Sequence, residues 1–260
     1  CRHRGIPKRT ADQLWEQFEP FARYGFNRAH AACYGLIAYY TAYLKANYPA
    51  EYMTAVLTHE AQGQDWMAKV ALAVAEARRM GIRVLPPDVN ASEENFSVEG
   101  AAIRFGLSAV KHVGAGAVQE IIRARQEGRF SSLADLCTRV DGRLVNKRVL
   151  ESLIKAGALD SLGQPRAQLL AGLDQALAAA QRAQRLRDSP QQGLFALDGP
   201  AVEPPPLLPV EEFSDEERLA MEKEMLGLYI SDHPLAHVQE DLAARVSLPI
   251  GQLSEVRDRA

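Results

Sequence analysis

Apolar residues recur every three or four positions over most of the first eighty residues, which is the spacing of an amphipathic helix. Helices are predicted over residues 11–18, 31–46, 50–61 and 65–80. Pro49 suits the first turn of a helix, and Gly81 suits the position that follows one. We therefore expect an all-helical first lobe.

The pattern changes after Gly81. Residues 84–90 hold two prolines and should be extended, whereas residues 95–98 and 102–105 alternate apolar and polar positions on either side of Glu99-Gly100. That alternation around a glycine turn predicts a β-hairpin. Helical spacing returns at residue 117, and residues 164–187, rich in Ala, Leu and Gln, predict one long helix.

Beyond that helix the apolar periodicity is lost. Residues 188–209 are rich in Pro, Gly and Gln, a composition that predicts a disordered linker. Helical spacing resumes over residues 214–230, where Ser214 as N-cap and Glu217 three positions later predict a capping box. The predicted fold class is mainly α, with one small β-hairpin, a disordered linker and a short helical segment.

Two short segments have the composition of phosphate-binding turns. In the first, Gly114 and Gly116 directly precede a helix, where they would allow a backbone conformation that side chains forbid and leave N–H groups facing outward. Lys111 lies just before this turn, and three arginines follow it, at positions 123, 125 and 129. A plain helix-entry turn without a ligand is the alternative.

The second segment repeats the arrangement. Asn146 is a helix cap, Lys147 and Arg148 lie in the first helical turn, and Gly157 ends the helix. The apolar stripe predicted to be buried comprises Val149, Leu150, Leu153 and Ile154. Turns of this kind can bind a DNA phosphate without recognising a base, and the paired units resemble tandem helix-hairpin-helix modules.

A third candidate site lies near Gly25, where cationic and amide side chains precede a tyrosine-rich helix. Its residues are Arg23, Asn27, Arg28 and His30. An anion there would meet a helix N-terminus and guanidinium groups, so a phosphate-bearing ligand is expected. The alternative is a solvated turn followed by an ordinary buried helix face, formed by Tyr34, Leu36, Ile37, Tyr40, Tyr43 and Leu44.

Several blocks of the chain resemble the alpha subunits of bacterial replicative DNA polymerase III. The segments FARYGFNRAHAACY (residues 21–34) and YYTAYLKANYPAEYM (residues 39–53) are similar to the fingers pattern FAGYGFNKSHAxAY and YQTAYLKAxYPxEFM. The other matching blocks, in family order, are MGIRVLPPDVN, IRFGLSAVKHVGAG, NKRVLESLIKAGALDSLG and LGLYISDHPL, which begin at residues 80, 103, 146 and 226. Together they cover nearly the whole chain.

The resemblance implies four regions. Residues 1–80 would be the later part of the fingers, 81–187 a tandem helix-hairpin-helix module, 188–213 a linker with a sliding-clamp-binding motif, and 214–260 a helical segment leading into an OB-like domain. Asn27 and Arg28 would approach the phosphates of an incoming deoxynucleoside triphosphate, and His30 would lie against its sugar. This chain departs from the family pattern at Arg23, Arg28 and Ala29, where Gly, Lys and Ser are usual, and the change at Ala29 removes a hydroxyl from the sugar contact.

The linker contains an apolar pair in a polar setting. Gln191, Leu194 and Phe195 form the pattern Gln-x-x-Leu-Phe, which resembles the clamp-binding peptide of bacterial polymerases. The resemblance implies that Leu194 and Phe195 enter a hydrophobic pocket of the clamp while Gln191 makes polar contacts at its rim. The alternative is a stray apolar pair.

Composition and charge agree with such a fragment. The net charge is −3, but residues 101–166 hold eleven Lys and Arg against six Asp and Glu, whereas residues 167–260 hold eight against sixteen. This asymmetry favours a nucleic-acid face followed by an acidic, partner-facing tail, although both could be solvated surfaces. Three widely spaced cysteines favour a reducing cytoplasm. Since the sequence shows no apolar run of about 18 residues and does not open on a charged-then-apolar segment, we expect neither membrane insertion nor secretion.

The sequence lacks the acidic element expected for catalysis. No Asp-x-Asp occurs, so we expect no catalytic residue, metal site or cofactor in this fragment, with the Mg²⁺ ions held by the palm of the parent polymerase. A cluster of acidic residues is interpreted as the solvated start of a helix: Glu211, Glu212, Asp215, Glu216 and Glu217. A zinc site at His233 and His237 is not expected, because Pro234 lies between them and no cysteine is near.

We therefore expect part of a template-directed DNA polymerase whose partners are primer-template DNA, deoxynucleoside triphosphate, the sliding clamp and other replicase subunits. The chain begins at Cys1 rather than at Met, which favours a fragment. The alternatives are a non-catalytic adaptor that binds DNA and the clamp, and a helical scaffold whose basic face has no ligand.

Overall fold

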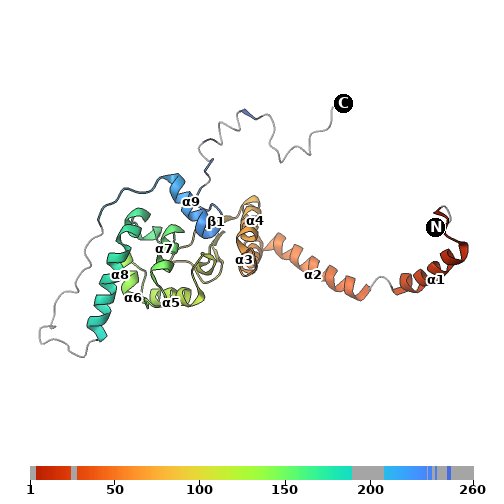
Figure 1. The fold of residues 1–260 in the computed structure, drawn as a ribbon, viewed down its shortest axis with the longest axis horizontal. Coiled ribbons are helices and arrows are strands. Elements are labelled where there is room, and N and C mark those ends of the chain that lie inside the picture. The colour runs from red at the N-terminus through yellow and green to blue at the C-terminus, as the bar shows by residue number, and fades with distance from the viewer. Residues whose placement is uncertain are drawn as a thin grey trace. The chain divides into compact units, whose positions relative to one another are not determined.

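The computed structural model describes residues 4–24, 28–188 and 208–232, with the isolated positions 234, 235, 238, 245 and 246. These residues are mainly helical and include one small sheet, which confirms the predicted fold class (Figure 1). They divide into two units, Cys1–Tyr52 and Met53–Ala260.

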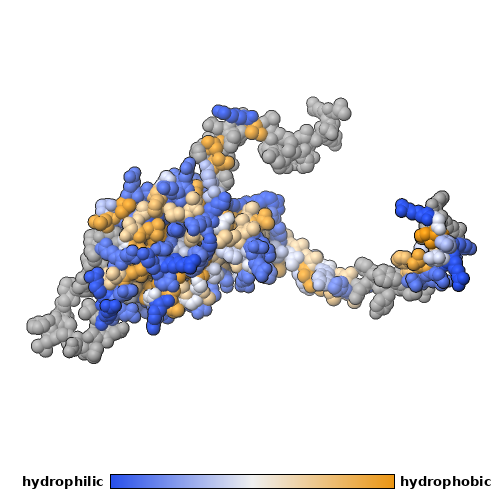
Figure 2. All heavy atoms as spheres, in the orientation of Figure 1, coloured by the Kyte–Doolittle hydropathy of each residue, from blue (hydrophilic) through white to orange (hydrophobic). Residues whose placement is uncertain are grey.

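The first unit consists of helices with little buried surface. Helices α1 (Lys8–Tyr24) and α2 (Arg28–Asn47) precede α3 (Pro49–Glu60), which starts at the proline predicted to begin it. No residue of α2 is buried: Tyr34 is 62% exposed and Ile37 is 55% exposed. The apolar colours of α2 are visible at the surface in Figure 2. The alternative of an ordinary buried helix face is therefore wrong for the described chain.

The second unit begins with a helix that packs on the sheet. Helix α4 (Trp66–Arg79) buries Val70, Val74 and Ala77 and contacts strand β1 (Arg83–Leu85). Gly81 has a φ of +80°, and the N–H of Ile82 donates to the carbonyl oxygen of Ala77 at 2.9 Å. This is the glycine-terminated helix end that the sequence predicted.

The sheet contains the predicted hairpin and one further strand. Strand β2 (Ser97–Glu99) pairs antiparallel with β3 (Ala102–Arg104), and Gly100 between them has a φ of +61°. Strand β1 pairs in parallel on the other edge of β3, with Val84 opposite Ile103. The sequence predicted β1 only as extended, because its partner lies far along the chain and leaves no local pattern.

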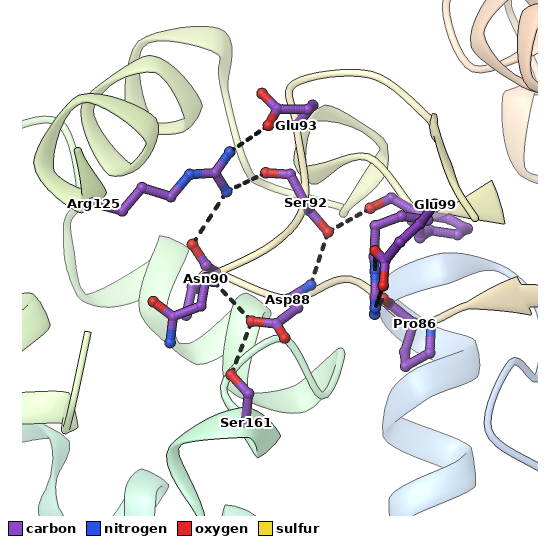
Figure 3. A network of polar contacts seen from close by, with 11 residues as sticks. Pro86, Asp88, Asn90, Ser92, Glu93, Glu99, Arg125 and Ser161 are labelled. Atoms are coloured by element: carbon purple, nitrogen blue, oxygen red, sulfur yellow. Dashed lines mark hydrogen bonds and ion pairs between the residues drawn. The ribbon is translucent and has the colours of Figure 1, made fainter. Parts of the chain in front are cut away.

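A polar network fixes the loop that follows β1, as Figure 3 shows. The hydroxyl of Ser92 donates to the Phe105 carbonyl at 2.7 Å, and the N–H of Asp88 donates to the Ser92 hydroxyl at 2.9 Å. Arg125 donates to the Ser92 carbonyl and pairs with Glu93 at 2.7 Å. Since the Arg125 side chain is only 13% exposed, this arginine holds the loop and is not a free cation at the surface.

The remaining helices build the core of the second unit. They are α5 (Ala115–Arg125), α6 (Leu133–Arg139), α7 (Lys147–Lys155), α8 (Arg166–Asp188) and α9 (Asp215–Leu226), with short 3-10 turns η2 (Leu107–Ala109) and η3 (Asp160–Leu162). Helices α6 and α7 pack against α8, and α9 packs against α7 (Figure 1). Leu150, Leu153 and Ile154 of α7 are fully buried, as the sequence predicted.

Acidic residues join α9 to this core. The carboxylate of Glu212 accepts the N–H groups of Arg166 at 2.8 Å and Ala167 at 3.0 Å, so it caps the start of α8. Burial alone would raise the pKa of Glu212, but the backbone donors outweigh it and the pKa is lowered. Glu212 is thus a structural cap, and its interpretation as a solvated carboxylate is wrong. Ser214 and Glu217 form the predicted capping box of α9.

The chain after α9 is held from two sides. The buried carboxylate of Glu222 accepts the N–H groups of Ile230 and Ser231, each at 3.2 Å. From α4, Arg78 donates to the carbonyl oxygens of Tyr229 and Ile230, each at 3.0 Å. These contacts account for the fixed course of residues 229–231.

Candidate nucleic-acid interface

The first of two helix-to-helix turns, called here the first hairpin, comprises residues 110–114 and connects η2 to α5. Val110 and Val113 are buried beneath it, and the Val113 N–H donates to the Val110 carbonyl at 3.1 Å. Between them His112 is exposed and has a φ of +67°, a left-handed conformation that is uncommon for a residue with a side chain. The turn therefore projects His112 and exposes the backbone that leads into α5.

The start of α5 is bare. Gly114 is the N-cap residue with φ −83° and ψ 159°, and no side chain caps the helix there. A Cβ on Gly114 would meet nothing within 4 Å, and one on Gly116 would make ordinary contact with Leu144 at 3.6 Å. The expectation that these glycines adopt a conformation forbidden to side chains is therefore wrong. What they provide is unshielded backbone at a helix N-terminus.

The second hairpin connects α6 to α7. The side chain of Asn146 accepts the Val149 N–H at 3.2 Å, which confirms the predicted cap. The N–H of Asp141 donates to Glu120 of α5 at 2.8 Å, and Val145 is fully buried. Gly157, with a φ of +80°, follows the end of α7 as predicted.

The two hairpins contact each other reciprocally. His112 of the first hairpin lies 3.2 Å from the guanidinium of Arg148, in the first turn of α7. Leu144 of the second hairpin lies against Gly116, in the first turn of α5. Because each turn contacts the first turn of the other hairpin's helix, the N-termini of α5 and α7 lie side by side. Both N-termini are exposed, and the positive ends of both helix dipoles lie at this surface.

The predicted cations of this surface differ in their exposure and in whether they are already paired. Arg148 is exposed and faces His112, whereas Lys147 pairs with Asp174 of α8 at 2.7 Å and its pKa is raised by that hydrogen bond. Lys111 is half-buried, and its backbone N–H donates to the Met225 carbonyl at 3.0 Å. Arg148 is therefore the best placed of the three to meet an anion.

Two further arginines have exposed side chains, one in the second hairpin and one in the last turn of α5, away from its N-terminus. Arg143, at the tip of the second hairpin, has an 89% exposed side chain and pairs with Asp141 at 2.9 Å. Arg123 pairs with Glu120 at 2.7 Å, and that hydrogen bond raises the pKa of Arg123. Arg143 was not predicted from the sequence, although its place in the turn before Asn146 could have signalled it.

The environment of His112 is cationic. Desolvation lowers the pKa of His112, and the positive charges of Arg148, Lys111 and Lys155 lower it further, while Glu224 raises it. An arriving phosphate would act in the opposite direction to the cations. His112 therefore reports on the potential at this surface.

The predicted nucleotide site is described only in part. Arg28 and His30 lie in the first turn of α2 and are exposed, and the His30 ring lies 4.4 Å from the Tyr34 ring. Asn27 lies outside the described residues, as does the side chain of Arg23. The structure thus keeps Arg28 and His30 together at a helix N-terminus.

The predicted clamp-binding residues Gln191, Leu194 and Phe195 also lie outside the described residues, as do His233 and His237. Within the described ranges, no three His, Cys, Asp or Glu side chains gather closely enough to hold a metal ion. None of the helices described there is both long and apolar enough to cross a bilayer.

Comparison with known proteins places this surface in a wider context. Residues 81–169, which contain both hairpins, match the family model described as a helix-hairpin-helix motif. The chain is 44% identical to the DNA polymerase III subunit alpha of Deinococcus radiodurans over 95% of the chain and 19% of that protein. It is 46% identical to the same subunit of Thermus aquaticus over 98% of the chain and 20% of that protein.

The subunit of Bacillus subtilis is 42% identical over 94% of the chain and 21% of that protein. The chain thus spans about a fifth of the length of the curated relatives it matches. Over nearly all of its length it is homologous to one segment of the DNA polymerase III alpha subunits, which confirms the resemblance that its sequence motifs indicated.

Proposed function

We propose that the paired hairpins hold the backbone of duplex DNA for a template-directed replicative DNA polymerase of which this chain is a part. The observation that carries the proposal is the side-by-side placement of two exposed helix N-termini, with Arg148 and Lys111 beside them. Backbone N–H groups and helix dipoles attract phosphate oxygens and recognise no base. The expected binding is weak and independent of sequence.

Salt dependence and backbone shielding test this proposal together. The affinity of the 260-residue chain for a fluorescent duplex should fall linearly with salt on a log-log plot, because each phosphate contact releases counterions. In the double variant Gly114→Val, Gly116→Val, affinity should fall roughly tenfold on every duplex sequence, since two branched side chains would cover the N–H groups. Valine fits the backbone conformation of Gly114, so helicity should remain.

Gln119→Val is the matched control. Gln119 is exposed on α5 one turn beyond the N-terminus, so the same side chain is added to the same helix away from the proposed phosphate site. We expect the affinity of this variant to equal that of the parent chain. If the glycine double variant, with normal circular dichroism, binds as tightly as the control, the two N-termini do not hold phosphate.

The relatives' name also supports a proposal for the longer protein. We infer that it is a DNA-directed DNA polymerase, that its catalytic carboxylates and Mg²⁺ lie outside this chain, and that it acts in the cytoplasm with other replicase subunits. Asn27, Arg28 and His30 would contact the incoming deoxynucleoside triphosphate. Ribonucleotide incorporation by a His30→Ala polymerase measures the sugar contact: an increase supports it, and unchanged discrimination contradicts it.

The clamp proposal rests on the linker sequence. Gln191, Leu194 and Phe195 would bind the hydrophobic pocket of a sliding clamp, and a peptide of residues 189–197 should bind a bacterial clamp weakly. Loss of binding on changing Leu194 and Phe195 to Ala would support it, and retention would contradict it. The proposed regions remain 1–80, 81–187, 188–213 and 214–260. A DNA-binding and clamp-binding adaptor is the alternative, which a palm encoded upstream would exclude.

A further inference from the structure

The C-terminal end of α9 lies against the first hairpin. The Lys111 N–H donates to the Met225 carbonyl at 3.0 Å, and Gly227, with a φ of +81°, ends the helix just beyond. At the same end, the Glu224 carboxylate lies 3.9 Å from the ammonium of Lys155 in α7. A negative side chain and the negative end of a helix dipole therefore border the cationic surface.

Glu224 opposes several positive charges there. The charged groups that act on His112 are Arg148 and Lys155 from α7, Lys111 from the hairpin itself and Glu224 from α9. Among these four described side chains, Glu224 alone is negative. Glu224 thus lies at the edge of the cationic surface and carries the opposite charge.

The position of Glu224 is not explained by stability. Its side chain is 54% exposed, and 3.9 Å is a long separation for an ion pair, so the pair with Lys155 stabilises the fold little. Helix α9 is held in place by other groups, notably buried Glu222 and the carbonyl of Met225. Glu224 therefore contributes its charge to the surface and little to the stability of the core.

We infer that Glu224 limits and positions DNA binding: it repels backbone phosphates that approach Lys155 and Lys111 from the α9 side. This inference rests on the proposed DNA function. The duplex backbone then follows the N-termini of α5 and α7 and stays clear of α9. The same repulsion weakens binding at low salt.

Charge removal at one position tests the inference. In the 260-residue chain, Glu224→Gln should bind a duplex roughly two- to fivefold more tightly at low salt, because a phosphate within a Debye length no longer meets a carboxylate. The gain should shrink at high salt, where the Debye length is shorter. Glu216→Gln is the matched control, since Glu216 is an exposed carboxylate two turns earlier on the same helix.

The outcomes separate this inference from the DNA proposal. If the parent chain binds no DNA, the proposed function itself fails. If the parent binds and both glutamine variants gain affinity equally, only net charge matters and the inference is overturned. The inference is also overturned if neither variant gains affinity. A second measurement needs no DNA: NMR titration of His112 should show a lower pKa in Glu224→Gln than in the parent or in Glu216→Gln, and equal values would overturn the placement of the carboxylate.

Discussion

Helices α2 and α7 are both rich in apolar residues, but their surroundings differ. Both carry apolar residues at helical spacing, yet α7 buries Val149, Leu150, Leu153 and Ile154 against its neighbours while α2 buries none of its residues. An amphipathic pattern predicts that a helix has an apolar face, and it leaves open where the covering surface comes from. In α7 that surface lies within the chain, and most helical stability comes from such packing.

The largest expected effect is a difference in stability between matched leucines. Leu150→Ala should lower the free energy of unfolding by about 2–5 kcal/mol, because Leu150 is fully buried and truncation leaves a cavity. Leu36→Ala in α2 should lower it by less than about 0.5 kcal/mol, since Leu36 is 50% exposed. Urea unfolding of the 260-residue chain gives both values. Similar losses for the two variants would break the comparison.

Hydrogen exchange extends the comparison to the backbone. Amides in the buried half of α7 should exchange only on global unfolding, whereas α2 buries no residue and should open locally. We expect protection factors in α2 to be lower by about a hundredfold or more. Equal protection, measured by NMR or mass spectrometry, would show that α2 is covered in solution.

The smallest effect concerns the charge that packing creates around His112. Its pKa lies below the ordinary value, so the ring is neutral at pH 7.5, and a bound phosphate would favour the protonated ring. DNA affinity should therefore rise roughly two- to fivefold between pH 7.5 and pH 5.5 at constant salt. His112→Gln should flatten this dependence. An unchanged pH profile in that variant would assign the titration to another group.

The same lowered pKa has the opposite sign for stability. The unfolded chain takes up the His112 proton more readily than the folded chain does. The contribution of His112 to stability is therefore present above the unfolded pKa and is lost as the pH falls through the folded pKa. Acid should thus strengthen DNA binding while it weakens folding, and the two effects are distinguishable by measuring unfolding without DNA.

The sequence predicted the helices well because their ends depend on neighbouring residues. Asn146 and Ser214 cap α7 and α9 as expected, and Gly81 and Gly157 adopt the positive φ that follows a helix. The hairpin around Gly100 was equally predictable from alternation and a turn residue. These features need only a few consecutive residues, so local patterns contain the information.

The sequence predicted which residues form the candidate site, but the structure corrected their backbone conformation and their partners. Its glycines and cations were identified from the sequence, but the left-handed residue of the first turn is His112, and neither Gly114 nor Gly116 has a positive φ. The sequence places Arg125 soon after the first turn, and the structure shows that its guanidinium binds a loop that is distant along the chain. Charge can be counted from a sequence, whereas the partner of each charge cannot.

By itself, then, the sequence determined the caps of α7 and α9 and the glycines that follow α4 and α7, which family the chain resembles and which residues could meet phosphate. Only the tertiary structure decided that Arg148 meets His112 and that Leu144 meets Gly116, which brings two helix N-termini together. It also decided that Glu212 caps a helix formed by residues far before it. The physical reason is range: caps and turns satisfy hydrogen bonds between near neighbours, while these contacts depend on how packed elements bring distant residues together.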